Sequence, residues 1–174
     1  RISMNQALLV TNIEKFLNKL ATEHYVILKW RGSLSQYQLK DDLDLLVENP
    51  VSTIQKLLLV ANEIVLEDFE IKVAQVSRDH VHFDWCSHDQ LIFRFDIYSG
   101  LSHFKCLTLP VEFTKRILSS RTQITGGNIY VPNEIDAMLV NYIEYLETPI
   151  LSERKLQHYQ WVSTKLFRHR KEFS

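Results

Sequence analysis

Glycine and proline are scarce in this sequence: each occurs four times among 174 residues. Long disordered and low-complexity segments are usually rich in such residues, so their scarcity favours a folded chain. Hydrophobic residues make up 45% of the sequence and charged residues 24%, which is the balance of an ordinary globular protein. A chain of this length can bury a core for one domain without disulfides or structural metals.

Cysteine is also rare, and long apolar runs are absent. Cys86 and Cys106 are the two cysteines and do not form a CxxC pair. A disulfide framework or zinc site is therefore not expected. We expect both cysteines to be reduced thiols in a cytoplasmic protein. Because no apolar run approaches the roughly 20 residues that span a bilayer, we expect no membrane partner. Residues 1–3 are expected to be an expression scar before a natural start at Met4.

The chain has no excess of either charge. It has 20 Lys and Arg against 21 Asp and Glu, for a net charge of −1. Binding of extended DNA or RNA usually requires a basic domain, so long nucleic acids are not expected as partners. The short basic run Arg168–Lys171 is typical of a solvated helix end. A local basic pocket for a phosphorylated small molecule remains compatible with this balance.

Hydrophobic periodicity predicts alternating helices and strands. Helices are expected over residues 5–22 and 54–65 and near 111–118. Strands are expected over five segments: 25–30, 42–47, 71–76, 80–85 and 91–98. A hairpin is expected to turn at Gly126-Gly127. This order predicts an α/β (α+β) fold with a mixed, mostly antiparallel β-sheet and helices on one face.

The C-terminal part is expected to be helical. Asn133 can cap a helix with a continuous apolar stripe, and Pro149 is expected to end it. Ser152 is then expected to open a last helix. We therefore expect residues 4–131 to form the α/β domain and residues 132–174 to form a helical appendage that packs on the same domain.

Two aspartates lie on one face of the predicted strand 42–47. Side chains alternate along a strand, so Asp42 and Asp44 point one way while Leu43 and Leu45 point into the core. The two carboxylates, about 6.5 Å apart along the strand, repel each other unless cations lie between them. Two divalent ions about 3.5–4 Å apart would neutralise them and prefer such oxygen ligands.

A third aspartate lies on the predicted strand 91–98. Asp96 shares one face of this strand with Arg94, and the opposite face is apolar. If this strand lies beside strand 42–47, Asp96 can reach the same ions. Arg94 could hold a phosphate or pair with a carboxylate, and the sequence leaves both roles open.

The segment Arg31-Gly32-Ser33 lies at a predicted strand end, shortly before the paired aspartates. Glycine lets the backbone approach a ligand closely. The Gly32 amide and the Ser33 hydroxyl could then donate hydrogen bonds to phosphate oxygens. Taken alone, Gly-Ser after a strand is more often a plain turn, so its significance depends on its position before the aspartates.

Together these residues resemble the polymerase-β-like nucleotidyltransferase superfamily, over roughly residues 23–100. The matching pattern is Gly32-Ser33, eight residues, Asp42-Leu43-Asp44-Leu45, and Asp96 on a later strand. The resemblance implies the nucleotidyltransferase fold and assigns the nucleotide phosphates to Gly32 and Ser33. It implies that Asp42 and Asp44 bind two magnesium ions, or manganese, and that Asp96 helps one metal activate the acceptor hydroxyl. Arg31 and Arg94 are further nucleotide-binding candidates that the minimal motif does not require.

Histidines form a second polar cluster in the sequence. His80, His82 and Asp84 would share one strand face, which makes a metal site conceivable. A solvated or substrate-facing surface is favoured, because these residues do not form a complete ligand set at a standard spacing. Cys86 beside His88 is likewise interpreted as a buried or turn thiol rather than a nucleophile.

These patterns lead to a hypothesis of function: magnesium-dependent transfer of a nucleoside monophosphate from a nucleoside triphosphate such as ATP to a small-molecule hydroxyl. The segment Ile129–Glu134 resembles nucleotidyltransferase-like proteins of bacterial surface-polysaccharide loci, which implies a carbohydrate or similar acceptor. Two alternatives remain open. One is a protein acceptor, as in antitoxin-type members of the superfamily, and the other is a non-catalytic nucleotide- or partner-binding module.

Overall fold

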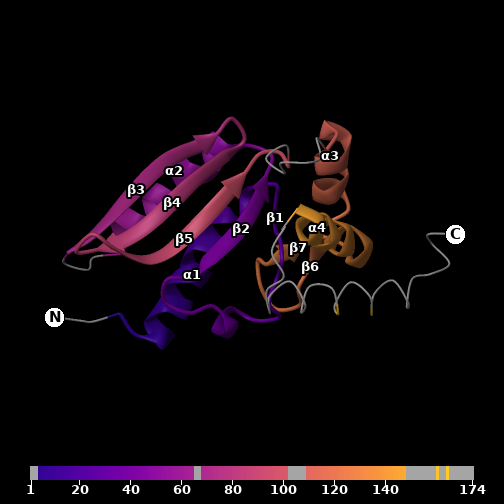
Figure 1. Cartoon of the computed structure of the whole chain (residues 1–174). Coiled ribbons are helices and arrows are strands. Elements are labelled where there is room, and N and C mark those ends of the chain that lie inside the picture. Colours follow the sequence, from indigo (N-terminus) through magenta and orange to yellow (C-terminus); the bar gives the residue numbers. More distant parts are fainter. Residues whose placement is uncertain (1–3, 65–67, 102–108, 148–159, 161–163, 165–174) are drawn as a thin grey trace, which may run out of the picture.

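A five-stranded sheet with helices on both sides dominates the computed structural model (Figure 1), which describes residues 4–64, 68–101, 109–147, 160 and 164. Along the chain the elements are α1 (Gln6–Lys19), η1 (Leu20–Thr22), β1 (Tyr25–Ile27), η2 (Leu34–Gln36), β2 (Asp42–Val47), α2 (Pro50–Glu63), β3 (Phe69–Ser77), β4 (His80–Ser87), β5 (Gln90–Tyr98), α3 (Val111–Ser119), β6 (Thr122–Gln123), β7 (Tyr130–Val131) and α4 (Glu134–Glu147).

The strand order of the large sheet is β1-β2-β5-β4-β3. Its neighbours pair antiparallel except for β2 and β5, which run in the same direction. The expected mixed, mostly antiparallel sheet is therefore confirmed. Strands β6 and β7 form a separate antiparallel pair on either side of the expected glycine turn. The parallel β2–β5 pair is central to the site, because it places the two aspartate-bearing strands side by side.

Local signals explain several element boundaries. The side chain of Asn5 accepts a hydrogen bond from the Leu8 amide at 2.9 Å and caps α1. Helix α2 begins at Pro50, earlier than the expected residue 54, because Asn49 caps it and proline suits the first helical position. Strand β1 ends at Ile27 and not at residue 30, because Lys29 adopts a left-handed backbone conformation with φ of 53°.

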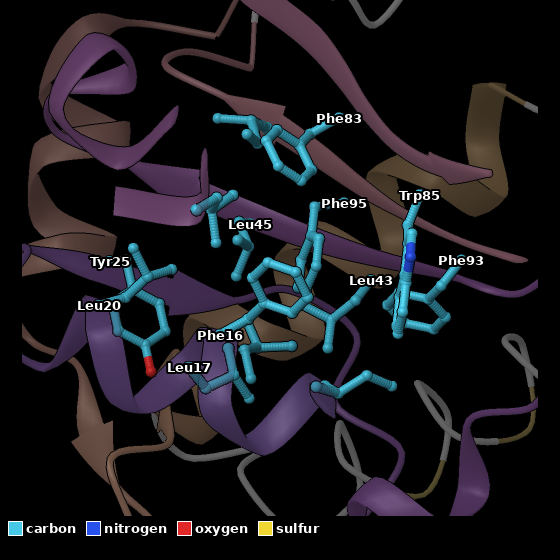
Figure 2. Packing of buried hydrophobic residues seen from close by; sticks show 14 of the residues in the cluster. Phe16, Leu17, Leu20, Tyr25, Leu43, Leu45, Phe83, Trp85, Phe93 and Phe95 are labelled. Atoms are coloured by element: carbon cyan, nitrogen blue, oxygen red, sulfur yellow. The ribbon is translucent and has the colours of Figure 1, made fainter. Parts of the chain in front are cut away.

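The main core lies between the sheet and helices α1 and α2. Figure 2 shows Phe16 and Leu17 of α1 facing Leu43 and Leu45 of β2, with the aromatic side chains of β4 and β5 beside them. Phe16 is fully buried. These apolar positions are the ones that strand alternation assigns to the core, so the predicted inner faces of β2 and β5 are confirmed.

A second, smaller core lies on the opposite face of the sheet at its β1 end. Val26 and Leu46 pack there against Ile117 and Leu118 of α3 and Val140 of α4. The expectation of helices on one face thus holds for α1 and α2. Helices α3 and α4 lie at the β1 edge of the sheet (Figure 1) and pack against the other face of β1 and β2. Next to this smaller core, the same face of the sheet carries polar side chains on β2, β5 and β4.

Helix α4 begins as expected, because the side chain of Asn133 accepts a hydrogen bond from the Asp136 amide at 2.8 Å.

No helix within the described ranges is both long and apolar enough to cross a membrane. The predicted stop at Pro149, the last helix from Ser152, the basic run Arg168–Lys171 and residues 1–3 lie outside the described residues. The proposed division at residue 131 stays a prediction.

Candidate functional site

Polar side chains form ordered rows across β2, β5 and β4, on the sheet face away from α1 and α2. The pairing register places Asp44 beside Asp96, and Asp96 beside His82. The neighbouring row runs from Asp42 to Arg94. The three predicted carboxylates therefore come together because β2 and β5 are parallel neighbours in this register.

The carboxylates of Asp42, Asp44 and Asp96 offer oxygen atoms that all lie within 4.8 Å of one another. Asp44 is 8% exposed and Asp96 is 6% exposed, whereas Asp42 is partly exposed. Three such groups in a partly buried site repel one another strongly unless a cation is present. The donor set suits hard divalent ions, which prefer oxygen ligands.

A lysine that the sequence pattern did not single out lies in this carboxylate cluster. The Lys29 Nζ atom is 2.7 Å from an Asp44 carboxylate oxygen and 3.5 Å from Glu144 of α4. Burial raises the pKa of Asp44, and the Lys29 ammonium acts in the opposite direction. The left-handed turn after β1 and the C-terminal part of α4 thus both contribute charged groups. Neither position has a local sequence signal, since only the packing brings Lys29 to Asp44 and Glu144 to Lys29.

Arg94 pairs with a carboxylate, one of the two roles that the sequence left open. Its guanidinium donates two hydrogen bonds to Asp84, at 2.6 and 2.8 Å. Such a bidentate pair fixes the plane of the guanidinium and raises the pKa of Arg94. The row continues on either side with Asp42 and Lys72, so that charges of opposite sign alternate across four strands. Arg94 is held in this row by Asp84.

Arg31, which directly precedes Gly32-Ser33, contacts the aspartates at the start of β2. Arg31 Nη1 is 2.5 Å from a carboxylate oxygen of Asp41, and Arg31 Nη2 is 3.8 Å from Asp42 Oδ1. Gly32 has φ of 93°, a conformation that residues with a Cβ atom rarely adopt, which is the physical reason for glycine here. The Ser33 hydroxyl lies 2.7 Å from that of Ser35.

The histidines of β4 contact the triad, which the sequence interpretation did not anticipate. The Nε2 atoms of His80 and His82 lie 2.9 and 3.1 Å from the same Asp96 oxygen. The sequence placed these histidines on one strand face but could not give the β4–β5 register that aligns them with Asp96. Asp84, which alternation places on the same strand face, pairs with Arg94. Cys86 is buried with a free thiol.

Comparison with known proteins gives a remote similarity to one solved structure. No protein-family model matches the sequence, and no curated protein matches it. Among solved structures, the chain is similar to the Megavirus polyadenylate synthase, with a TM-score of 0.47 and 11% sequence identity. The match covers 95% of this chain and 33% of that chain, so this chain spans about a third of its length. Because the likeness is this remote, any functional assignment depends on the geometry of the site.

Proposed function

We propose that this chain is a divalent-metal-dependent nucleotidyltransferase that moves a nucleoside monophosphate from a nucleoside triphosphate to the hydroxyl of a small-molecule acceptor. The observation that carries the proposal is the convergence of Asp42, Asp44 and Asp96 from two parallel neighbouring strands. The residues fit a cation, because three carboxylates approach one another and a lysine ammonium already lies against Asp44.

In the proposed reaction the acceptor hydroxyl loses its proton to solvent, its oxygen forms a bond to the α-phosphorus, and the bond from that phosphorus to pyrophosphate breaks. Magnesium ions bound at the site would supply Lewis-acid activation of the acceptor hydroxyl and neutralise the charge of the triphosphate. Asp42 and Asp44 would hold these ions, and Asp96 would orient the acceptor side of the site. Holding the reactants in line accounts for most of the catalysis expected in such chemistry.

The loop before β2 provides the proposed phosphate contact. The open left-handed turn at Gly32 has no side chain and no heavy atom near its Cβ position, so a ligand can approach its backbone. The Ser33 hydroxyl would exchange its contact with Ser35 for a phosphate oxygen. Arg31 ties this loop to Asp41 and Asp42, which keeps the proposed phosphate site next to the carboxylates.

Ligand-dependent stability tests this proposal directly. Thermal unfolding is measured with ATP, CTP, GTP and UTP, each with and without magnesium, on the wild type, Asp42→Asn and the control Asp89→Asn. At least one nucleotide is expected to stabilise the wild type, by about 2.7 kcal/mol at a hundredfold excess over Kd. The effect should require magnesium, be lost in Asp42→Asn and persist in Asp89→Asn. Absence of a magnesium-dependent shift with all four nucleotides would contradict the proposal.

Lys29 is expected to compete with the metal. Because its ammonium lies 2.7 Å from Asp44, it occupies part of the volume that a bound cation needs. Lys29→Met is therefore expected to raise magnesium affinity by about fivefold, or about 1 kcal/mol. Calorimetric titration of magnesium without nucleotide measures the change, with Lys56→Met as the matched control. An unchanged or weaker affinity would show that Lys29 does not oppose the ion.

A further inference from the structure

Two imidazole rings and a carboxylate converge on the β4 side of the aspartate triad. His80 and His82 of β4 and Asp96 of β5 offer ligand atoms that lie within 4.8 Å of one another. Both Nε2 atoms face the same carboxylate oxygen, at 2.9 and 3.1 Å. The side chains are only 11%, 23% and 9% exposed, in that order, so the cluster is largely shielded from solvent.

The rings are held in place by their neighbours. His80 stacks on Tyr98, with ring centroids 4.2 Å apart and an angle of 22° between the planes. His82 meets the His80 ring edge to face, with centroids 4.8 Å apart. The β4–β5 register sets these positions, because His82 pairs with Asp96 and His80 with Tyr98. The three ligand atoms are therefore prearranged by the sheet.

The separations are close to those of a coordinated ion. Two bonds of about 2.0–2.1 Å at a tetrahedral angle place ligand atoms about 3.3 Å apart. The two nitrogen–oxygen separations of 2.9 and 3.1 Å fall a few tenths of an ångström below this value. A bound ion would replace the hydrogen bond between His80 and Asp96 and move the ligand atoms slightly apart.

We propose that His80, His82 and Asp96 bind a divalent transition-metal ion such as Zn²⁺. Imidazole nitrogen suits first-row transition ions, whereas Mg²⁺ prefers oxygen and keeps several waters. Two histidines and one carboxylate also leave a fourth position for water or a substrate oxygen. The proposal needs only these three residues, so it does not depend on nucleotidyl transfer.

Asp96 belongs to both donor sets. A carboxylate has two oxygens, so Asp96 could serve as a ligand on both sides. Asp42, Asp44 and Asp96 would then form the magnesium-binding part, and His80, His82 and Asp96 the part that binds the transition-metal ion. The consequence is a centre with two chemically unlike positions, one of oxygen ligands and one that includes two nitrogens.

Cobalt provides the probe, because Co²⁺ reports nitrogen ligation and low coordination number through its visible absorption. Co²⁺ is titrated into metal-free wild type, His80→Gln, His82→Gln and His88→Gln, with absorption and calorimetry as readouts. Glutamine keeps an N–H donor toward Asp96 but is a poor transition-metal ligand. The wild type and His88→Gln are expected to develop intense visible bands, and the His80 and His82 variants to bind at least about tenfold more weakly.

The outcomes separate this proposal from the proposed function. Asp42→Asn should keep the cobalt bands while losing the magnesium-dependent nucleotide shift, and Zn²⁺ should displace Co²⁺ from the histidine site. Wild type without intense bands would overturn the histidine site, whatever the nucleotides do. Equal cobalt affinity in wild type, His80→Gln and His82→Gln would overturn it as well, because the ion would then lie among the carboxylates.

Discussion

Replacing Asp44 by asparagine is expected to lower the rate of magnesium-dependent pyrophosphate release by about a hundredfold to a thousandfold. Asp44 is the central carboxylate, two residues from Asp42 on the same strand and directly beside Asp96 on the next. An amide cannot supply the charge that holds a divalent ion. The measurement is pyrophosphate release from a mixture of the four nucleoside triphosphates, with a set of small hydroxyl-bearing acceptors.

The fold of the Asp44→Asn variant is expected to survive. Burial already disfavours the charged form of this side chain and raises its pKa. The neutral amide removes repulsion from Asp42 and Asp96, which offsets the lost ion pair with Lys29. Lys29 keeps Glu144 as a partner, so the loss in free energy of unfolding should stay below the about 3–5 kcal/mol that an uncompensated buried charge costs. With Asp89→Asn as the active control, retention of more than a tenth of wild-type turnover in Asp44→Asn would contradict the metal role.

Replacing Phe16 by alanine is expected to destabilise the protein by about 3–5 kcal/mol. Phe16 is fully buried and meets Phe83, Trp85 and Phe95 edge to face, at centroid distances of 6.2, 6.0 and 5.2 Å. Truncation removes these contacts and leaves a cavity between α1 and the sheet (Figure 2). Urea unfolding should show a lower midpoint with an unchanged slope.

A matched control for this prediction lies on α2. Leu59 is 52% exposed, so Leu59→Ala should change the free energy of unfolding by about 0.5 kcal/mol or less. The loss of unfolding free energy in Phe16→Leu should lie between those of Leu59→Ala and Phe16→Ala, because leucine keeps much of the buried volume. A loss of less than about 1 kcal/mol in Phe16→Ala would mean that α1 contributes little to the core that supports β2 and β5.

Short-range patterns in the sequence predicted much of the secondary structure. Strand β2 has the bounds expected, and helix α1 and strands β4 and β5 lie where periodicity placed them. The fold class follows from the order of these elements. Boundaries differ where a single residue overrides the pattern, as at Lys29, whose backbone turns left-handed and ends β1 early.

The sequence by itself determined which side chains share a face, because alternation along a strand is a local property of the backbone. It therefore placed Asp42 with Asp44, and Asp96 with Arg94. Only the tertiary structure decided the neighbours across strands, because strand order and register depend on packing between distant segments. That packing places Asp96 between Asp44 and His82 in the sheet. It also pairs Arg94 with Asp84 and Lys29 with Asp44.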